Sequence, residues 1–81
     1  MNLKSIQYFL VAAEEMSFTK ASDRLFISQQ ALSSHIKRLE SEYGVQLFER
    51  RPALQLTQEG EQMLFYSKHI LDGEAKMRSS F

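Results

Sequence analysis

The stretch that decides the fold of this chain covers residues 17–43 and reads SFTKASDRLFISQQALSSHIKRLESEY. In its second half, apolar residues recur with the period of one helix face; they are Leu32, Ile36, Leu39 and Tyr43. This spacing predicts a helix whose apolar face is turned toward a core. Ser28 precedes the pattern and can accept a hydrogen bond from the first turn, so the helix is expected to begin directly after it.

The opposite face of this helix is polar and suits a DNA groove. It carries Gln30, Ser33, Ser34 and Lys37, with Gln29 in the first turn and Arg38 at the edge. Amides can bond adenine bidentately, hydroxyls can address several base edges, and cations can pair with phosphates. A solvated helix face is the alternative for a polar stripe on its own, so the neighbouring segments must decide between the two.

A shorter helix is expected over residues 18–25, before the polar-faced one. Ser17 is a suitable N-cap, and Ala21 and Leu25 fall on an inward face while Thr19 points outward. Only two apolar residues, Phe26 and Ile27, separate this helix from Ser28. Two helices joined by so tight a turn predict a helix-turn-helix, although the turn contains no glycine.

A hairpin is predicted after the polar-faced helix. Gly44 stands where a left-handed residue would end that helix. Two short apolar segments then flank the run Arg50-Arg51-Pro52, which indicates a β-hairpin wing with a cationic tip. Paired arginines at a turn can simply be solvated, but beside a helix-turn-helix they are placed for backbone phosphates or a narrow minor groove.

The two ends of the chain are predicted to be helical. Asn2 can cap a first helix that turns Ile6, Phe9, Leu10 and Ala13 toward the core. Thr57 can cap a last helix that runs to about Met77 or Arg78. Its apolar residues Met63, Tyr66, Ile70 and Met77 form one seam, called here the C-terminal seam, which is too long for a small domain to cover. The seam predicts a homodimer; fraying of the helix's second half is the alternative.

Composition narrows the function classes. The 81 residues carry no net charge, with an excess of +2 over residues 17–57, and make one small domain. Without cysteine there is no disulfide or thiolate site, and two distant histidines do not suggest zinc, so no cofactor is expected. No cluster suggests an acid–base pair or nucleophile, so the chain is not expected to be an enzyme. No apolar run could span a membrane, and a cytoplasmic location is expected.

Five segments carry a family resemblance: FTKA (residues 18–21), LFISQQALS (25–33), IKRLE (36–40), GVQLFER (44–50) and LTQEG (56–60). In this order and spacing, the chain resembles the DNA-binding region of bacterial LysR-type transcriptional regulators over nearly its whole length. The resemblance implies a mainly α fold, with a winged helix-turn-helix over residues 1–57 and a linker helix for dimerisation over residues 58–81. It also implies a C-terminal domain, absent from these residues, that senses a small-molecule effector.

The resemblance also implies roles for individual residues. The domain would bind an inverted-repeat operator as a dimer, with its third helix in the major groove. The residues implied to contact DNA bases are Gln29, Gln30, Ser33 and Ser34. Those implied to contact the DNA backbone or minor groove are Thr19, Ser28, Lys37, Arg38, Arg50 and Arg51. Gln30 stands where proline is common and Ser34 where arginine is frequent, so the preferred base sequence stays open.

Overall fold

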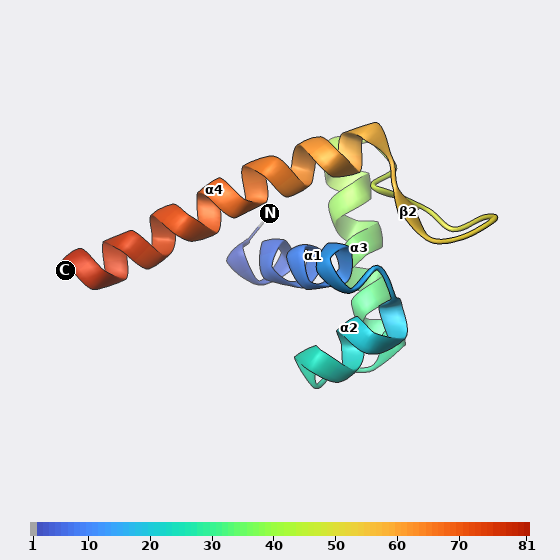
Figure 1. Cartoon of the computed structure of the whole chain (residues 1–81), viewed down its shortest axis with the longest axis horizontal. Coiled ribbons are helices and arrows are strands. Elements are labelled where there is room, and N and C mark those ends of the chain that lie inside the picture. The colour runs from blue at the N-terminus through green and yellow to red at the C-terminus, as the bar shows by residue number, and fades with distance from the viewer. Residues whose placement is uncertain (1) are drawn as a thin grey trace.

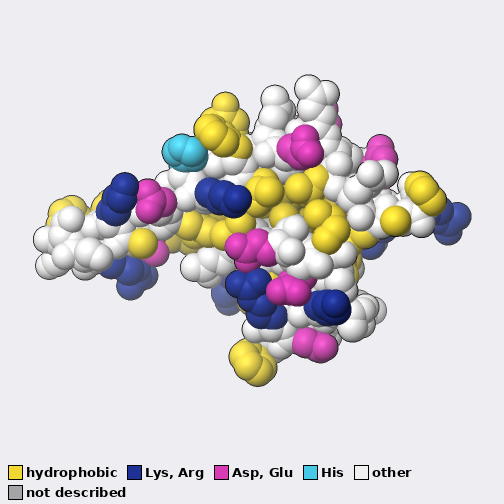
Figure 2. Space-filling model, viewed as in Figure 1, with side chains coloured by type: hydrophobic (Ala, Val, Ile, Leu, Met, Phe, Trp, Pro, Cys, Tyr) yellow, Lys and Arg dark blue, Asp and Glu magenta, His cyan; other side chains and the backbone are white. Residues whose placement is uncertain are grey.

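The computed structural model describes residues 2–81, which form four helices and one two-stranded hairpin. The elements are α1 (Leu3–Glu15), α2 (Phe18–Leu25), α3 (Gln29–Tyr43), β1 (Phe48–Glu49), β2 (Gln55–Leu56) and α4 (Gln58–Ser80). Helices α1, α2 and α3 pack together, the hairpin projects on one side, and α4 extends toward the other (Figures 1 and 2). The predicted architecture, a mainly α winged helix-turn-helix followed by a long helix, is confirmed.

All four helices begin at the predicted caps, because each cap bonds a backbone N–H of its own first turn. Asn2 Oδ1 accepts from Ser5, Ser17 Oγ from Lys20, Ser28 Oγ from Ala31 and Thr57 Oγ1 from Gly60, at 2.8 to 3.2 Å. At its other end α4 continues to Ser80, slightly beyond the predicted limit, and Gly73 does not interrupt it.

Three helices end at a left-handed residue. Gly44 has φ +67° and ends α3 as predicted. The helix-turn-helix turn, which lacks glycine, is closed instead by Phe26 at φ +57°, and α1 ends at Met16 with φ +49°. Residues with side chains adopt this backbone region rarely. The Phe26 side chain is 94% exposed, so the apolar link between the helices is not packed into the core on that side.

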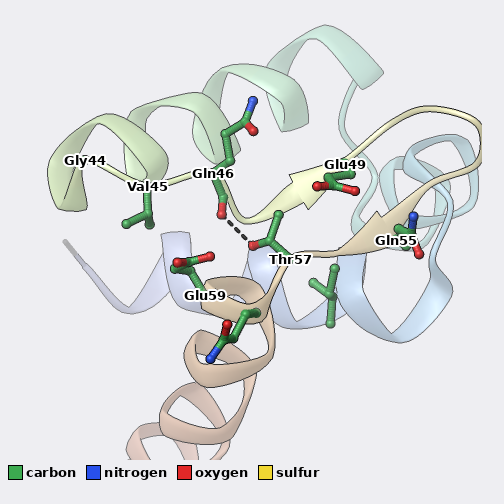
Figure 3. Close-up of a pocket in the computed structure, with 9 residues that line it drawn as sticks. Gly44, Val45, Gln46, Glu49, Gln55, Thr57 and Glu59 are labelled. Carbon is green, nitrogen blue, oxygen red and sulfur yellow. Dashed lines mark hydrogen bonds between the residues drawn. The ribbon is translucent and has the colours of Figure 1, made fainter.

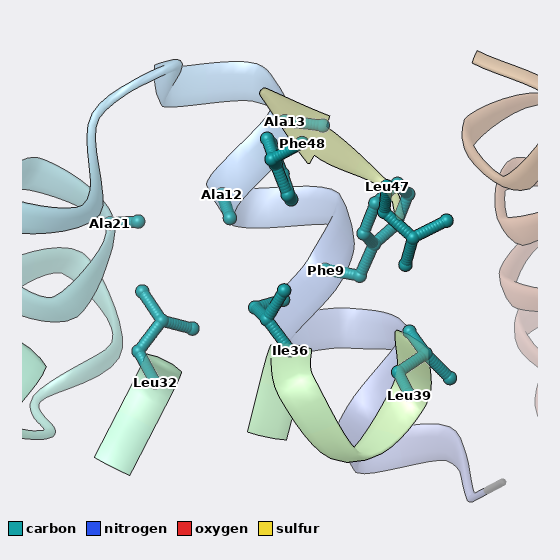
Figure 4. Close-up of a cluster of buried hydrophobic side chains, with 9 residues drawn as sticks. All are labelled: Phe9, Ala12, Ala13, Ala21, Leu32, Ile36, Leu39, Leu47 and Phe48. Atoms are coloured by element: carbon teal, nitrogen blue, oxygen red, sulfur yellow. The ribbon is translucent and has the colours of Figure 1, made fainter. Parts of the chain in front are cut away.

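The core lies where α1, α2, α3 and β1 meet (Figure 4). It consists of Phe9, Ala12, Ala13, Ala21, Leu32, Ile36, Leu39, Leu47 and Phe48. Ile6 is also buried, whereas the predicted core residues Leu10 and Leu25 are half-buried. The inward placement of Tyr43 was wrong: it is 48% exposed, because it ends α3 and lines a groove beside α4 with Met63 and Ile70.

The hairpin and the start of α4 are tied to the same segment of chain. β1 and β2 pair antiparallel, with Phe48 opposite Leu56. Thr57 donates its hydroxyl proton to the Gln46 carbonyl at 2.6 Å (Figure 3). Its backbone N–H donates to the Leu47 carbonyl at 3.0 Å. Gly60 is buried so closely against Leu47 that a Cβ atom there would overlap the Leu47 carbonyl oxygen. The first turn of α4 is therefore part of the packed body.

Candidate nucleic-acid interface

The exposed side of α3 carries the polar residues that the sequence pointed to. Gln29, Gln30, Ser34, Lys37 and Arg38 are exposed, and Ser33 is half-buried. The buried residues of the same helix are Leu32, Ile36 and Leu39. Since both sets follow the helical period, the core fixes the rotation of α3 and leaves one continuous polar stripe free to enter a groove.

The hairpin adds cations beside this stripe. Lys37 and Glu40 of α3 line an open groove with Phe48, Arg50 and Arg51 of the hairpin segment. Glu40 Oε2 accepts the backbone N–H of Leu47 at 2.8 Å, which fixes the chain to α3 just before β1. Together the stripe and the hairpin arginines make one surface, called here the α3–hairpin face: Gln29, Gln30, Ser33, Ser34, Lys37, Arg38, Arg50 and Arg51.

The cations of this face are not neutralised by the protein. Within residues 2–81, Lys37, Arg38, Arg50 and Arg51 form no ion pair, and neither does Lys20 at the start of α2. Three other cations are paired: Arg24 with Glu14 at 2.9 Å and Glu15 at 3.2 Å, Lys76 with Asp72, and Arg78 with Glu74. Lys4 on α1 and Lys68 on α4 also form no ion pair within the described residues. Unpaired cations on an exposed face are available to phosphates.

Two predicted contact residues have different local roles. Ser28 is exposed and its hydroxyl oxygen already accepts the Ala31 N–H, although the hydroxyl proton is still available for a phosphate. Thr19 is exposed in the first turn of α2, and its backbone carbonyl accepts the hydroxyl of the buried Ser22. Both lie on the helix-turn-helix with their side chains accessible.

His35 is a feature of α3 that the sequence reasoning missed. Its ring meets the edge of Tyr8 from α1 at 4.7 Å, and its Nδ1 is buried without a hydrogen-bond partner in the described chain. Burial lowers the pKa of His35, and the charges of Arg38 and Lys4 lower it further. Helical spacing could have indicated that His35 is partly buried, because it lies one turn before the buried Leu39, at the border of the apolar face.

The C-terminal seam is largely uncovered in a single chain. Met63 packs partly against the core, but Tyr66 is 61%, Ile70 38% and Met77 52% exposed. Figure 2 shows hydrophobic side chains gathered where α4 leaves the body. Phe65, which was not predicted to matter, is also exposed, and its ring contacts those of Tyr66 and His69. The predicted excess of apolar surface is confirmed; dimerisation stays a prediction.

Two further features of the described chain concern metal ions and membranes. Residues 2–81 contain no group of three or more histidine, aspartate or glutamate side chains that could hold a metal ion. No helix there is both long and apolar enough to cross a membrane.

Comparisons with known proteins agree with this geometry. The family model described as bacterial regulatory helix-turn-helix protein, lysR family, matches residues 3–61. Among curated proteins, the transcriptional regulator BenM of Acinetobacter baylyi is 38% identical over 96 aligned positions, covering 100% of this chain and 32% of BenM. The regulator XapR of Escherichia coli is 44% identical over 71 positions, covering 86% of this chain and 24% of XapR.

A solved structure provides the matching fold. A crystal structure of the BenM DNA-binding domain with catB site 1 DNA superposes with a TM-score of 0.94 at 41% identity, covering 99% of this chain and 91% of that one. The chain thus spans a quarter to a third of the curated relatives' length, yet nearly all of a DNA-binding domain.

Proposed function

The chain belongs to the LysR family of bacterial regulatory helix-turn-helix proteins, and on that premise we propose that it binds double-stranded DNA as the reading domain of a transcriptional regulator. The α3–hairpin face is the binding surface in this proposal. Helix α3 enters the major groove, and the hairpin follows the DNA backbone or the adjacent minor groove.

The observation that carries this proposal is the gathering of four unpaired cations on one exposed polar face, whereas the other cations without an ion pair in the described chain lie singly on α1, α2 and α4: Lys4, Lys20 and Lys68. Arg24, Lys76 and Arg78 are held by the protein's own carboxylates, whereas the four cations of the α3–hairpin face are not. Because the net charge is zero, this local excess rather than the overall balance attracts phosphates. The BenM domain, which shares the fold, is found in complex with DNA.

Roles within the face follow from its geometry. The residues proposed to read bases, Gln29, Gln30, Ser33 and Ser34, occupy the N-terminal turns of α3. Those proposed to contact the backbone lie around them, on α2, at the α3 cap, further along α3 and on the hairpin: Thr19, Ser28, Lys37, Arg38, Arg50 and Arg51. Phosphate contacts fix the register of the helix, and base contacts supply the discrimination.

The second element of the proposal is a homodimer. We assign dimerisation to the C-terminal seam, residues Met63, Tyr66, Ile70 and Met77, because three of the four are exposed on a helix that leaves the body. Residues 1–57 then act as the DNA-binding unit and residues 58–81 as the linker, although the first turn of α4 packs on the body. A two-fold dimer fits an inverted-repeat operator.

The proposal assigns neither catalysis nor ligand sensing to these 81 residues. Sensing of a small-molecule effector is placed in a C-terminal domain, in the part of the relatives that this chain does not match. Since the proposed target is bacterial DNA, the proposed site of action is the cytoplasm.

Salt-dependent binding tests the central claim. We expect the purified chain to bind a DNA duplex with an affinity that falls steeply as salt rises, with a log–log slope of about −0.9 per phosphate contacted. Selection from a random duplex pool should enrich an inverted repeat whose half-sites are about one helical turn apart. Absence of duplex binding at low salt would refute DNA binding, and enrichment of single half-sites alone would refute the dimer.

A further inference from the structure

The two hairpin arginines differ in how the protein holds them. The Arg50 guanidinium carbon lies over the Phe18 ring, 4.6 Å from its centroid. Arg51 is exposed, and no cation–π contact or ion pair holds it within residues 2–81. One arginine is therefore positioned before any ligand arrives, while the other is free to sample many rotamers.

The Phe18 ring is itself held in place. It meets the Phe48 ring edge-on at a centroid distance of 5.3 Å, and Phe48 is tilted against Phe9 at 5.6 Å. Phe48 and Phe9 are buried core residues, so an unbroken series of ring contacts runs from the core to the Arg50 guanidinium. Phe18 is also the first residue of α2, whose start is capped by Ser17.

This arrangement leaves Arg50 able to bind an anion. A guanidinium has five N–H donors and no acceptor, and contact with a ring occupies only one side of it. Arg50 forms no ion pair within the described chain, and it lines the open groove with Lys37 and Arg51. Glu40 and Glu49 line the same groove, so its cations exceed its carboxylates by one. A phosphodiester of a DNA strand passing between α3 and the hairpin has the charge that these cations fit.

We infer that Phe18 is a positioning residue for DNA binding: its ring holds the Arg50 guanidinium at the α3–hairpin groove, ready to receive a backbone phosphate. This inference rests on the proposed DNA-binding function. Prepositioning reduces the side-chain entropy lost on binding, so Phe18 contributes to affinity without touching DNA. Arg51, which has no such ring, contributes by charge alone.

A double-mutant cycle on a mixed-sequence duplex tests this inference. Phe18→Leu removes the ring but keeps an apolar side chain against Phe48, and should weaken binding about 2- to 5-fold. In an Arg50→Ala background the same change should have no further effect, because there is no guanidinium left to position. In an Arg51→Ala background it should have its full effect. Phe18→Tyr, which keeps a ring, should bind as wild type does.

Two outcomes would overturn the inference while leaving DNA binding intact. One is an equal loss from Phe18→Leu with and without Arg50, which would indicate a general structural effect. The other is wild-type affinity in Phe18→Leu. Wild type that binds no duplex would instead overturn the proposed function. Each variant is checked for folding by circular dichroism, and Phe18→Met replaces Phe18→Leu in the cycle if the latter is unfolded at the assay temperature.

A measurement without DNA examines the contact directly. Side-chain protons of Arg50 near the ring should show upfield ring-current shifts in the NMR spectrum, which Phe18→Leu removes and Phe18→Tyr keeps. The matched protons of Arg51 should resonate as in a solvated arginine. Unshifted Arg50 protons in the wild-type chain would refute the stack and with it the positioning role.

Discussion

The α3–hairpin face and the C-terminal seam are both exposed surfaces, but the face is polar and cationic whereas the seam is apolar. The face presents amides, hydroxyls and cations that form no ion pair within residues 2–81, whereas the seam presents Tyr66, Ile70 and Met77 exposed in the single chain. Electrostatic association weakens with salt, and association through apolar burial does not. The proposal therefore assigns to one small domain two interfaces for chemically different partners, DNA and a second copy of the chain, which salt should separate.

The largest effect is expected from a charge in the seam. Ile70→Glu would bury a carboxylate if the dimer formed, so we predict a monomer whose affinity for a full inverted repeat falls on the order of 100-fold or more, toward that of a half-site. The fold should survive because Ile70 lies outside the core cluster. Sedimentation equilibrium and duplex binding measure the two effects.

A matched control for this prediction lies on the same helix. Ala75→Glu adds the same charge at an exposed position on another side of α4, and it should leave dimer and affinity unchanged. A variant Ile70→Glu that remains dimeric, or wild type that is monomeric at high micromolar concentration, would show that the seam is not the interface.

The face should respond in a sequence-dependent way. Gln29→Ala removes an amide from the first turn of α3, and should cost about 1–3 kcal/mol of binding free energy on the selected site but little on mixed-sequence DNA. Gln7→Ala, at an exposed position of α1, is the control and should cost nothing on either. Titrations on both duplexes decide the matter; an equal loss on both would mean that Gln29 does not read bases.

Two glycines of α4 distinguish the part of the helix that packs on the core from the part that extends away from it. Gly60→Ala forces a methyl group into the Leu47 carbonyl and should lower the free energy of unfolding by about 1–3 kcal/mol. Gly73→Ala meets no atom within 4 Å and should raise local helix stability by up to about 1 kcal/mol. Urea unfolding measures the first effect, and amide exchange along α4 the second. Similar effects at both positions would contradict the division.

The hairpin cations should act through charge. Arg50→Ala and Arg51→Ala should each weaken specific and non-specific binding alike, and lower the magnitude of the log K against log salt slope by about one for each phosphate that is no longer neutralised. Lys76→Ala, which removes a cation already paired with Asp72 on α4, is the control with an unchanged slope. An unchanged slope in both hairpin variants would place the hairpin away from DNA.

The smallest effect is expected from His35, and it concerns pH. Its pKa is lower in the folded chain than the ordinary value of about 6.5, so below that pH the unfolded chain binds more protons. The free energy of unfolding should therefore fall as pH drops through about 6.5. His35→Gln should lose this part of the pH dependence in thermal melts at pH 5 and pH 7.5. Parallel curves for wild type and variant would exclude His35 as the cause.

Local chemistry made most of the fold predictable from the sequence. Helix caps and ends form hydrogen bonds to residues three or four positions away, so their roles as caps depend on local sequence. The residues with such roles are Asn2, Ser17, Ser28, Thr57 and Gly44. The buried stripe of α3 follows from helical periodicity, and that stripe also fixes which residues face outward. The polar face of α3 was therefore predictable from the amino-acid sequence alone.

Tertiary structure decided the features that depend on residues distant in sequence. Tyr43 continues the apolar period of α3 but is half-exposed, and it lines a groove beside α4 instead of joining the core cluster. Ser67 is fully buried although it interrupts the apolar pattern of α4, and His35 is shielded by Tyr8 from another helix. Burial is set by which elements pack together, and no local pattern contains that information.

The hairpin arginines illustrate the same limit at the proposed site. Arg50 and Arg51 are adjacent in the sequence at one turn, and no sequence pattern distinguishes one arginine from the other. Only the packing of β1 against α2 brings Arg50 over Phe18, thirty-two positions earlier in the chain. The sequence by itself determined the helices, their caps and the residue types on each face, because these depend on neighbours within one turn. The tertiary structure decided which of the two adjacent arginines is held against an aromatic ring, because that contact joins elements distant in the sequence.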